Sequence, residues 1–133
     1  MEQEPIALGA STLAGHWKLS NLIMFYDKND IQIAGNTSRV DSTDYAMLYD
    51  AMGWHVQEID GHNHEEIRTA LGTAQSNDKP SIIIGKTVIA KGSHSLENSP
   101  KSHGSPFSED EIKLTKEKLE IPQDSFYCNE DII

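Results

Sequence analysis

Five consecutive apolar residues, Leu22-Ile23-Met24-Phe25-Tyr26, are followed directly by four polar residues, Asp27-Lys28-Asn29-Asp30. A continuous apolar run of this length predicts a strand buried on both faces, as in a parallel sheet. The polar residues predict a turn where that strand ends. Ile31 and Ile33 come next, and residues 35–38 are expected to form a loop.

Other segments extend this pattern along the chain. Strands are predicted over residues 54–59 and 81–89, from their apolar and β-branched residues. Helices are predicted over residues 7–17, from Ser42 or Thr43 to about residue 52, from Asn63 to the break at residues 78–80, and from Ser108, with Glu111 completing a capping box. Helices that alternate with buried strands predict an α/β fold, with a parallel sheet and flanking helices.

Charge and composition argue against several classes of partner and against a membrane-spanning protein. The chain has 133 residues, with 11 basic against 21 acidic side chains and a formal net charge of −10. Nucleic acid and anionic membrane are therefore not expected as partners, because binding a polyanionic surface needs a basic one. A small anionic ligand stays possible where local groups or a metal offset the overall charge. The longest apolar stretches are strand-sized, so no transmembrane helix is expected. A single cysteine, Cys128, excludes an intrachain disulfide and is typical of a cytoplasmic chain.

Candidate ligand-binding residues follow the strands, because open parallel sheets bind ligands beyond the carboxyl ends of their strands. The Asn29 side-chain oxygen and the Ile31 carbonyl are ligands that suit Mg²⁺ or Ca²⁺. His103, in the long loop at 92–106, suits hydrogen bonding to an anionic cofactor or proton transfer. On spacing alone, an ordinary polar turn and a solvated loop histidine are the commoner explanations of these residues.

Several motifs, in this order, resemble the transketolase family. The likeness runs from about Glu4 to the C-terminal tail, and its motifs are Leu13-Ala14-Gly15-His16, Phe25-Tyr26-Asp27-Lys28-Asn29-Asp30-Ile31, Gly53-Trp54-His55-Val56, Asp60-Gly61-His62, Lys86-Thr87-Val88-Ile89 and Ser102-His103-Gly104-Ser105-Pro106. The resemblance implies a thiamine-diphosphate-binding fold. It also implies the family reaction, which transfers a two-carbon ketol unit between ketose and aldose phosphates in the pentose phosphate pathway.

The resemblance also implies roles for matching positions. Asn29 and the Ile31 carbonyl would bind the metal, Mg²⁺ or Ca²⁺, and Asn29 would also contact the diphosphate. Ile33 and Ile89 would contact thiamine diphosphate, and His103 would contact the diphosphate and the substrate as the catalytic candidate. The implied partners are sugar phosphates and a second chain, either in a homodimer or as a complementary transketolase chain.

Departures from the family pattern predict a partial domain. The family's metal motif opens with Gly-Asp-Gly, whose Asp is a direct ligand, and this triplet does not occur in the chain. We expect residues 1–133 to be the C-terminal half of the diphosphate-binding domain, with 1–107 forming the sheet, helices and cofactor loop and 108–133 forming a helix and tail. The isolated chain is expected to be inactive.

Three other interpretations remain open at this point. One is a non-catalytic truncated fragment, which the substitutions Pro5 and Gly9 at usual Gly and Glu positions favour. Another is part of a related thiamine enzyme, such as a dihydroxyacetone synthase or a deoxyxylulose phosphate synthase. The last is an acidic α/β metal-binding module.

Overall fold

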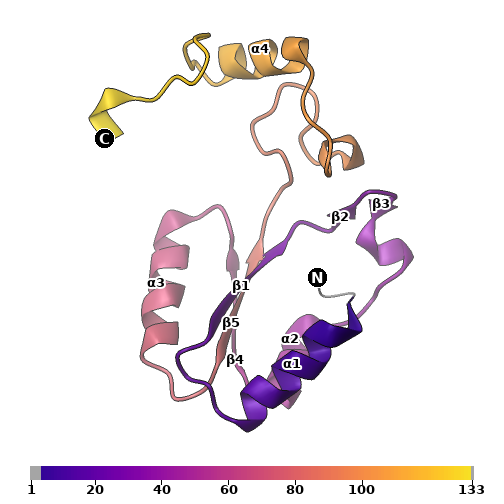
Figure 1. Cartoon of the computed structure of the whole chain (residues 1–133), viewed down its shortest axis with the longest axis vertical. Helices are drawn as coiled ribbons and strands as arrows, with labels where there is room; N and C mark the ends of the chain where they lie inside the picture. The colour runs from indigo at the N-terminus through magenta and orange to yellow at the C-terminus, as the bar shows by residue number, and fades with distance from the viewer. Residues whose placement is uncertain (1–3, 133) are drawn as a thin grey trace. The chain divides into compact units, whose positions relative to one another are not determined.

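A three-stranded parallel sheet organises the computed structural model, which describes residues 4–132 (Figure 1). Its strands are β1 (Ile23–Lys28), β4 (His55–Asp60) and β5 (Ser81–Lys86), in the order β1-β5-β4. Central β5 is aligned so that Ile83 lies opposite Phe25 on one side and Gln57 on the other. The prediction of an α/β fold with a parallel sheet is confirmed.

Helices cover both faces of this sheet (Figure 1). They are α1 (Pro5–His16), α2 (Tyr45–Ala51) and α3 (His64–Gln75). Because successive strand residues point to opposite faces, Ile82 and Ile84 belong to the core under α1 and α2. Ile83 packs instead with the small residues of α3, chiefly Ala70 and Ala74.

A polar and aromatic cluster joins α1, α2 and the start of β4. The Trp54 indole donates to the Ser11 carbonyl at 2.9 Å, and the Ser11 hydroxyl donates to the Tyr49 hydroxyl at 3.2 Å. The rings of Tyr49 and Trp54 meet edge to face, with centroids 5.2 Å apart. Buried Tyr and Trp side chains thus have partners for their polar atoms, which is what makes them tolerable in a core.

The described residues fall into two compact units. Unit 1 contains residues 4–30 and 37–87, with the sheet, its three helices and the short 3₁₀ helix η1 (Thr37–Arg39). Unit 2 contains residues 31–36 and 88–132. Its elements are the antiparallel pair β2 (Ile31–Gln32) and β3 (Gly35–Asn36), the 3₁₀ helices η2 (Pro100–Ser102) and η3 (Glu130–Ile132), and α4 (Glu109–Lys118).

Helix caps test the sequence predictions most directly. The cap expected at Ser42 or Thr43 is wrong, because Asp44 begins α2 and its carboxylate accepts from the Met47 backbone N–H at 3.0 Å. The cap at Asn63 is confirmed, since its side chain accepts from two backbone N–H groups in the first turn of α3. At α4, Ser108 caps as predicted, but the Glu111 carboxylate bonds to Ser95.

Two other predictions need adjustment. The third strand ends at Lys86, three residues earlier than expected, and the chain then leaves the sheet. The segment expected to be a loop at 35–38 contributes instead to β3 and η1. Among residues 4–132, no helix combines the length and apolar character needed to cross a bilayer.

Candidate functional site

The turn after β1 is fastened to the end of β5, both in unit 1. The Thr87 hydroxyl donates to the Asp27 carboxylate, and the Lys86 ammonium pairs with the Asp30 carboxylate. The Thr87 backbone N–H donates to the Lys28 carbonyl at 3.2 Å. These contacts hold the turn that presents Asn29 at the carboxyl edge of the sheet, the edge where open parallel sheets bind ligands.

A glycine and an unusual backbone conformation allow the turns after β1 and β4 to lie close to the end of β5. A Cβ on Gly61, in the turn after β4, would lie 2.5 Å from the Thr87 side chain. Asp30 adopts a positive φ of 61°, which aspartate tolerates better than most residues. Sequence reasoning singled out Asn29 but missed the supporting roles of Thr87 and Lys86. Their place directly at the end of the central strand was the available signal.

The other candidate residues lie in unit 2. Ile31 pairs with Asn36 across the β2–β3 hairpin, and Ile33 lies between these strands with 78% of its surface exposed. Half-buried Ile89 and His103 belong to the long loop at 88–106, where the Ile89 carbonyl accepts from the Asn98 backbone N–H at 2.9 Å. The hairpin therefore brings Ile31 and Ile33 together, whereas Ile89 and His103 lie at separate points of the loop.

His103 has an unusual imidazole. Its Nδ1 atom is buried and has no hydrogen-bond partner among the described residues. A buried polar atom without a partner is destabilising unless something bonds to it. The backbone of His103 is held by a turn, because its N–H donates to the Pro100 carbonyl at 3.1 Å and Gly104 follows at φ 77°. The imidazole therefore fits a ligand that offers a hydrogen-bonding group at Nδ1.

The metal candidates are oxygen atoms of an amide and a carbonyl. Within residues 4–132, no cluster of three or more His, Cys, Asp or Glu side chains is placed to hold a metal ion. Amide and carbonyl oxygens suit Mg²⁺, which binds few protein groups and completes its shell with water and phosphate oxygens. The donors at Asn29 and Ile31 therefore fit a metal that a diphosphate also ligates.

Two carboxylates have shifted titration. The Tyr45 hydroxyl, 2.5 Å from the Asp41 carboxylate, lowers the pKa of Asp41 most, and the Thr43 backbone N–H adds to the effect. Hydrogen bonds from the Ser95 hydroxyl and N–H lower the pKa of Glu111 below its ordinary value. Both shifts arise because the bonds stabilise the ionised form.

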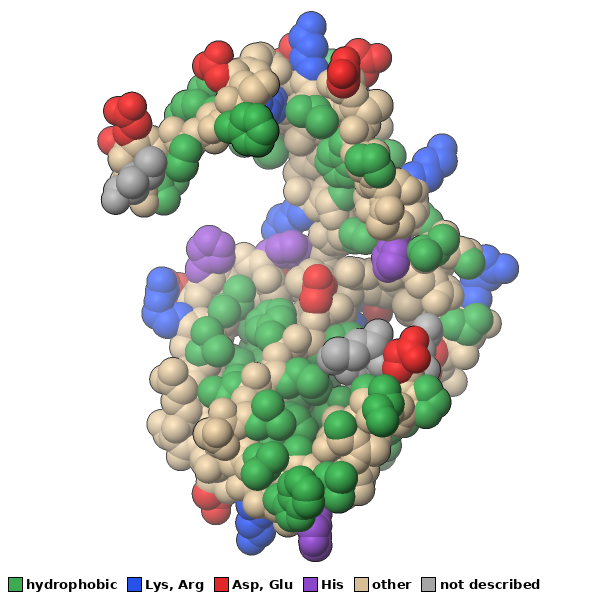
Figure 2. Space-filling model, viewed as in Figure 1, with side chains coloured by type: hydrophobic (Ala, Val, Ile, Leu, Met, Phe, Trp, Pro, Cys, Tyr) green, Lys and Arg blue, Asp and Glu red, His purple; other side chains and the backbone are tan. Residues whose placement is uncertain are grey.

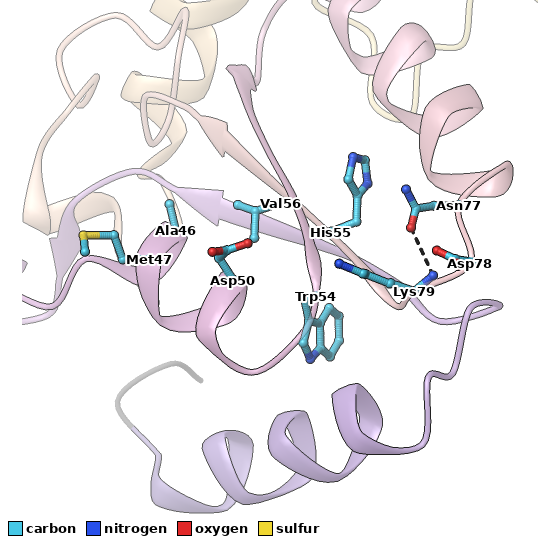
Figure 3. Close-up of a pocket in the computed structure, with 9 residues that line it drawn as sticks. All are labelled: Ala46, Met47, Asp50, Trp54, His55, Val56, Asn77, Asp78 and Lys79. Atoms are coloured by element: carbon cyan, nitrogen blue, oxygen red, sulfur yellow. Dashed lines mark hydrogen bonds between the residues drawn. The ribbon is translucent and has the colours of Figure 1, made fainter.

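A groove of about 550 Å³ lies in unit 1, at the amino ends of β4 and β5 (Figure 3). Its walls come from α2, the start of β4 and the α3–β5 connection, and its lining residues are Ala46, Met47, Asp50, Trp54, His55, Val56, Asn77, Asp78 and Lys79. This is the end of the strands away from Asn29. The groove is therefore separate from Asn29, the cofactor candidate of unit 1.

A family model described as the transketolase thiamine diphosphate binding domain matches residues 2–133. This chain belongs to that family. A transketolase from Sinorhizobium medicae is 39% identical over 130 residues, a match that covers 98% of this chain and 19% of the relative. The resemblance that the motifs predicted is thus confirmed.

Solved transketolase structures share the fold. The crystal structure of transketolase from Campylobacter jejuni matches with a TM-score of 0.93 and 43% identity, over 97% of this chain and 21% of that one. A Pichia stipitis transketolase in complex with sedoheptulose-7-phosphate matches with a TM-score of 0.92 and 34% identity, over 98% and 20% of the two chains. The present chain spans about one fifth of the length of these transketolases.

Proposed function

We propose that this chain supplies part of the cofactor site of a transketolase, which transfers a two-carbon ketol unit between ketose and aldose phosphates. The observation that carries the proposal is the Asn29 turn, fastened to β5 at the carboxyl edge of the sheet in a member of this family. The sugar-phosphate complex of the Pichia stipitis relative supports the substrate class.

Different residues of this chain bind different parts of the metal and cofactor. Asn29 and the Ile31 carbonyl hold Mg²⁺ (or Ca²⁺), and Asn29 also contacts the diphosphate. Ile33 and Ile89 offer apolar contacts to thiamine. His103 serves as the catalytic residue, and its unpartnered Nδ1 is the atom that bonds to diphosphate or substrate. Thiamine diphosphate supplies, when bound, the carbon nucleophile and electron sink of ketol transfer.

We propose that a second polypeptide completes the site, either in a homodimer or as a complementary transketolase chain. The sequence contains no Gly-Asp-Gly triplet, so the family's metal-binding aspartate has no counterpart within these 133 residues. The chain also spans only about one fifth of the length of the transketolases that it matches, so most residues of such an enzyme lie outside it. A cytoplasmic location and a place in the pentose phosphate pathway belong to the same proposal, supported by the family and the single cysteine.

Asn29→Ala tests the binding role, with Asn21→Ala as a matched control at the opposite end of β1. We expect the intact chain and Asn21→Ala to bind thiamine diphosphate in a Mg²⁺-dependent way by calorimetric titration. Asn29→Ala should bind about tenfold more weakly, because one metal and diphosphate ligand is lost. Equal affinities for the two variants would contradict the role of Asn29, and no binding by the intact chain would contradict the proposed function.

Two further measurements distinguish the proposed function from a metal-binding module and from a chain that is active alone. Binding of Mg²⁺ that is unaffected by thiamine diphosphate would favour a metal-binding module. A coupled assay should detect no ketol transfer by the chain alone. Cofactor-dependent transfer would contradict the need for a second polypeptide.

A further inference from the structure

Three polar side chains lie one turn apart along α4, and all three bond to the loop that follows Ile89. The Glu111 carboxylate accepts from the Ser95 N–H at 2.8 Å and from its hydroxyl at 2.7 Å. Thr115 and Lys118 contact the two preceding residues: the Thr115 hydroxyl oxygen accepts from the His94 N–H at 2.9 Å, and the Lys118 ammonium donates to the Ser93 carbonyl at 2.7 Å. We call these three residues, Glu111, Thr115 and Lys118, the α4 clasp.

Burial sets Glu111, the first residue of the clasp, apart from a solvated surface carboxylate. Glu111 is only 8% exposed and Ser93 only 2%. A buried carboxylate is unfavourable unless hydrogen bonds replace its water, and here each oxygen accepts one. Beside the clasp, a Cβ on Gly92 would lie 3.2 Å from the Leu119 side chain, so the loop packs closely against the end of α4.

Short-range bonds connect the clasped residues to His103. The loop is tied together by the Gly92 N–H on the Glu97 carboxylate at 2.8 Å and by the Leu96 N–H on the Ser93 hydroxyl at 3.2 Å. Further along, the Ser99 N–H donates to the Leu96 carbonyl at 3.1 Å. Ser99 also caps η2, whose first carbonyl accepts the His103 N–H. Hydrogen bonds therefore link the loop from the clasp to the backbone of His103.

We propose that Glu111 is a positioning residue, which with Thr115 and Lys118 fastens residues 93–95 to α4 and so holds the His103 imidazole for its ligand. The inference rests on the proposed function for the identity of that ligand, the diphosphate of thiamine diphosphate. The geometry of the fastening stands independently, because it lies wholly within unit 2. The clasp also explains why the capping box is incomplete, since the Glu111 carboxylate is used on the loop.

The test compares Glu111→Gln with Glu117→Gln in the full chain. Both remove one negative charge from α4, but Glu117 is exposed and lies outside the clasp. NMR of the ring nitrogens and of amide exchange is the readout. In Glu111→Gln we expect about tenfold faster exchange at Ser95 and a shifted His103 ring signal. Glu117→Gln should match the wild type, and the Ile83 amide should be unchanged in both.

Affinity for thiamine diphosphate with Mg²⁺ supplies the second readout. Glu111→Gln should bind about threefold to tenfold more weakly than Glu117→Gln, because fewer molecules hold His103 in its binding position. A wild-type chain that binds no cofactor would contradict the proposed function, and the ring signals would then decide the positioning role alone.

Two results would overturn the positioning role. One is faster exchange at Ser95 with an unchanged His103 ring, which would make Glu111 a purely structural residue of the loop. The other is a shifted ring with undiminished affinity in a chain that does bind. If Glu111→Gln does not fold, Ser95→Ala removes one donor to the same carboxylate without altering α4 and gives the same readouts.

Discussion

Asn29, the proposed ligand of metal and diphosphate, lies in a turn that residues far along the chain hold in place. Its turn is held by the backbone bond from Thr87 and by two side-chain contacts at the end of β5. The ion pair of Lys86 and Asp30 is largely exposed, and such pairs contribute little to stability. The backbone bond and the buried strand beneath it therefore do most to fix the turn.

Asp44 leads to a prediction at the same scale. Asp44→Ala should lower the free energy of unfolding by about 0.5–2 kcal/mol, because an N–H in the first turn of α2 loses its acceptor. Ser42→Ala, two residues earlier, should change it by less than about 0.5 kcal/mol. Urea unfolding of both variants is the measurement. A larger loss of stability in Ser42→Ala than in Asp44→Ala would show that Ser42, and not Asp44, caps α2.

Helix α1 illustrates packing at the scale of elements. It lies against the end of α2 at Gly15, where an added Cβ would sit 1.9 Å from the Met52 carbonyl oxygen. Gly9, in the same helix, has open space around its Cα. Gly15 is therefore needed for the close contact between the helices, whereas Gly9 lies where a side chain would meet no neighbour.

This contrast predicts opposite effects of one substitution. Gly15→Ala should destabilise the chain by about 1–3 kcal/mol, because α1 has to move away from α2. Gly9→Ala should stabilise it by about 0.5–1 kcal/mol, since alanine is the better helix former. Thermal unfolding followed by circular dichroism compares the two. Changes of the same sign would show that helix propensity, not contact, governs both positions.

Among the described residues, a carboxylate with a lowered pKa lies in each of the two units, so a fall in pH should destabilise both units. Asp41 belongs to unit 1 and Glu111 to unit 2. A lowered folded pKa means that the charged form stabilises the fold at neutral pH. That contribution is complete above the ordinary pKa values of 3.8 and 4.5, and it is lost as the pH falls through the lower folded values.

We therefore expect the stability of unit 1 to fall below about pH 3.8 and that of unit 2 below about pH 4.5. Urea unfolding followed by the fluorescence of buried Trp54 reports unit 1, and Asp41→Asn should flatten its pH dependence. Amide exchange at Ser95 reports the stability of unit 2, and Glu111→Gln should flatten the pH dependence of that stability. Asp110→Asn, on α4 outside the clasp, serves as the control. An unchanged slope in Asp41→Asn would show that other carboxylates govern acid unfolding of unit 1.

The sequence by itself determined the fold class, the order of the strands along the chain and the family. The strands at 22–26 and 81–84 can be read from the sequence because an apolar run is a local property. Burial on both faces was predicted for 22–26 and is wrong there, since Leu22 and Phe25 are 40% and 42% exposed, whereas residues 81–84 are buried. The family motifs are equally local, so Asn29, Ile31, Ile33, Ile89 and His103 could be named as site candidates before any coordinates existed.

Only the tertiary structure decided which residues support those candidates. The contacts of Asp27 with Thr87 and of Ser95 with Glu111 join positions 60 and 16 residues apart. Propensity and spacing carry no information about such pairs, because they depend on how separate elements pack. The same limit explains the misplaced cap of α2 and the unexpected partner of Glu111: several nearby side chains were chemically suitable, and packing selected among them.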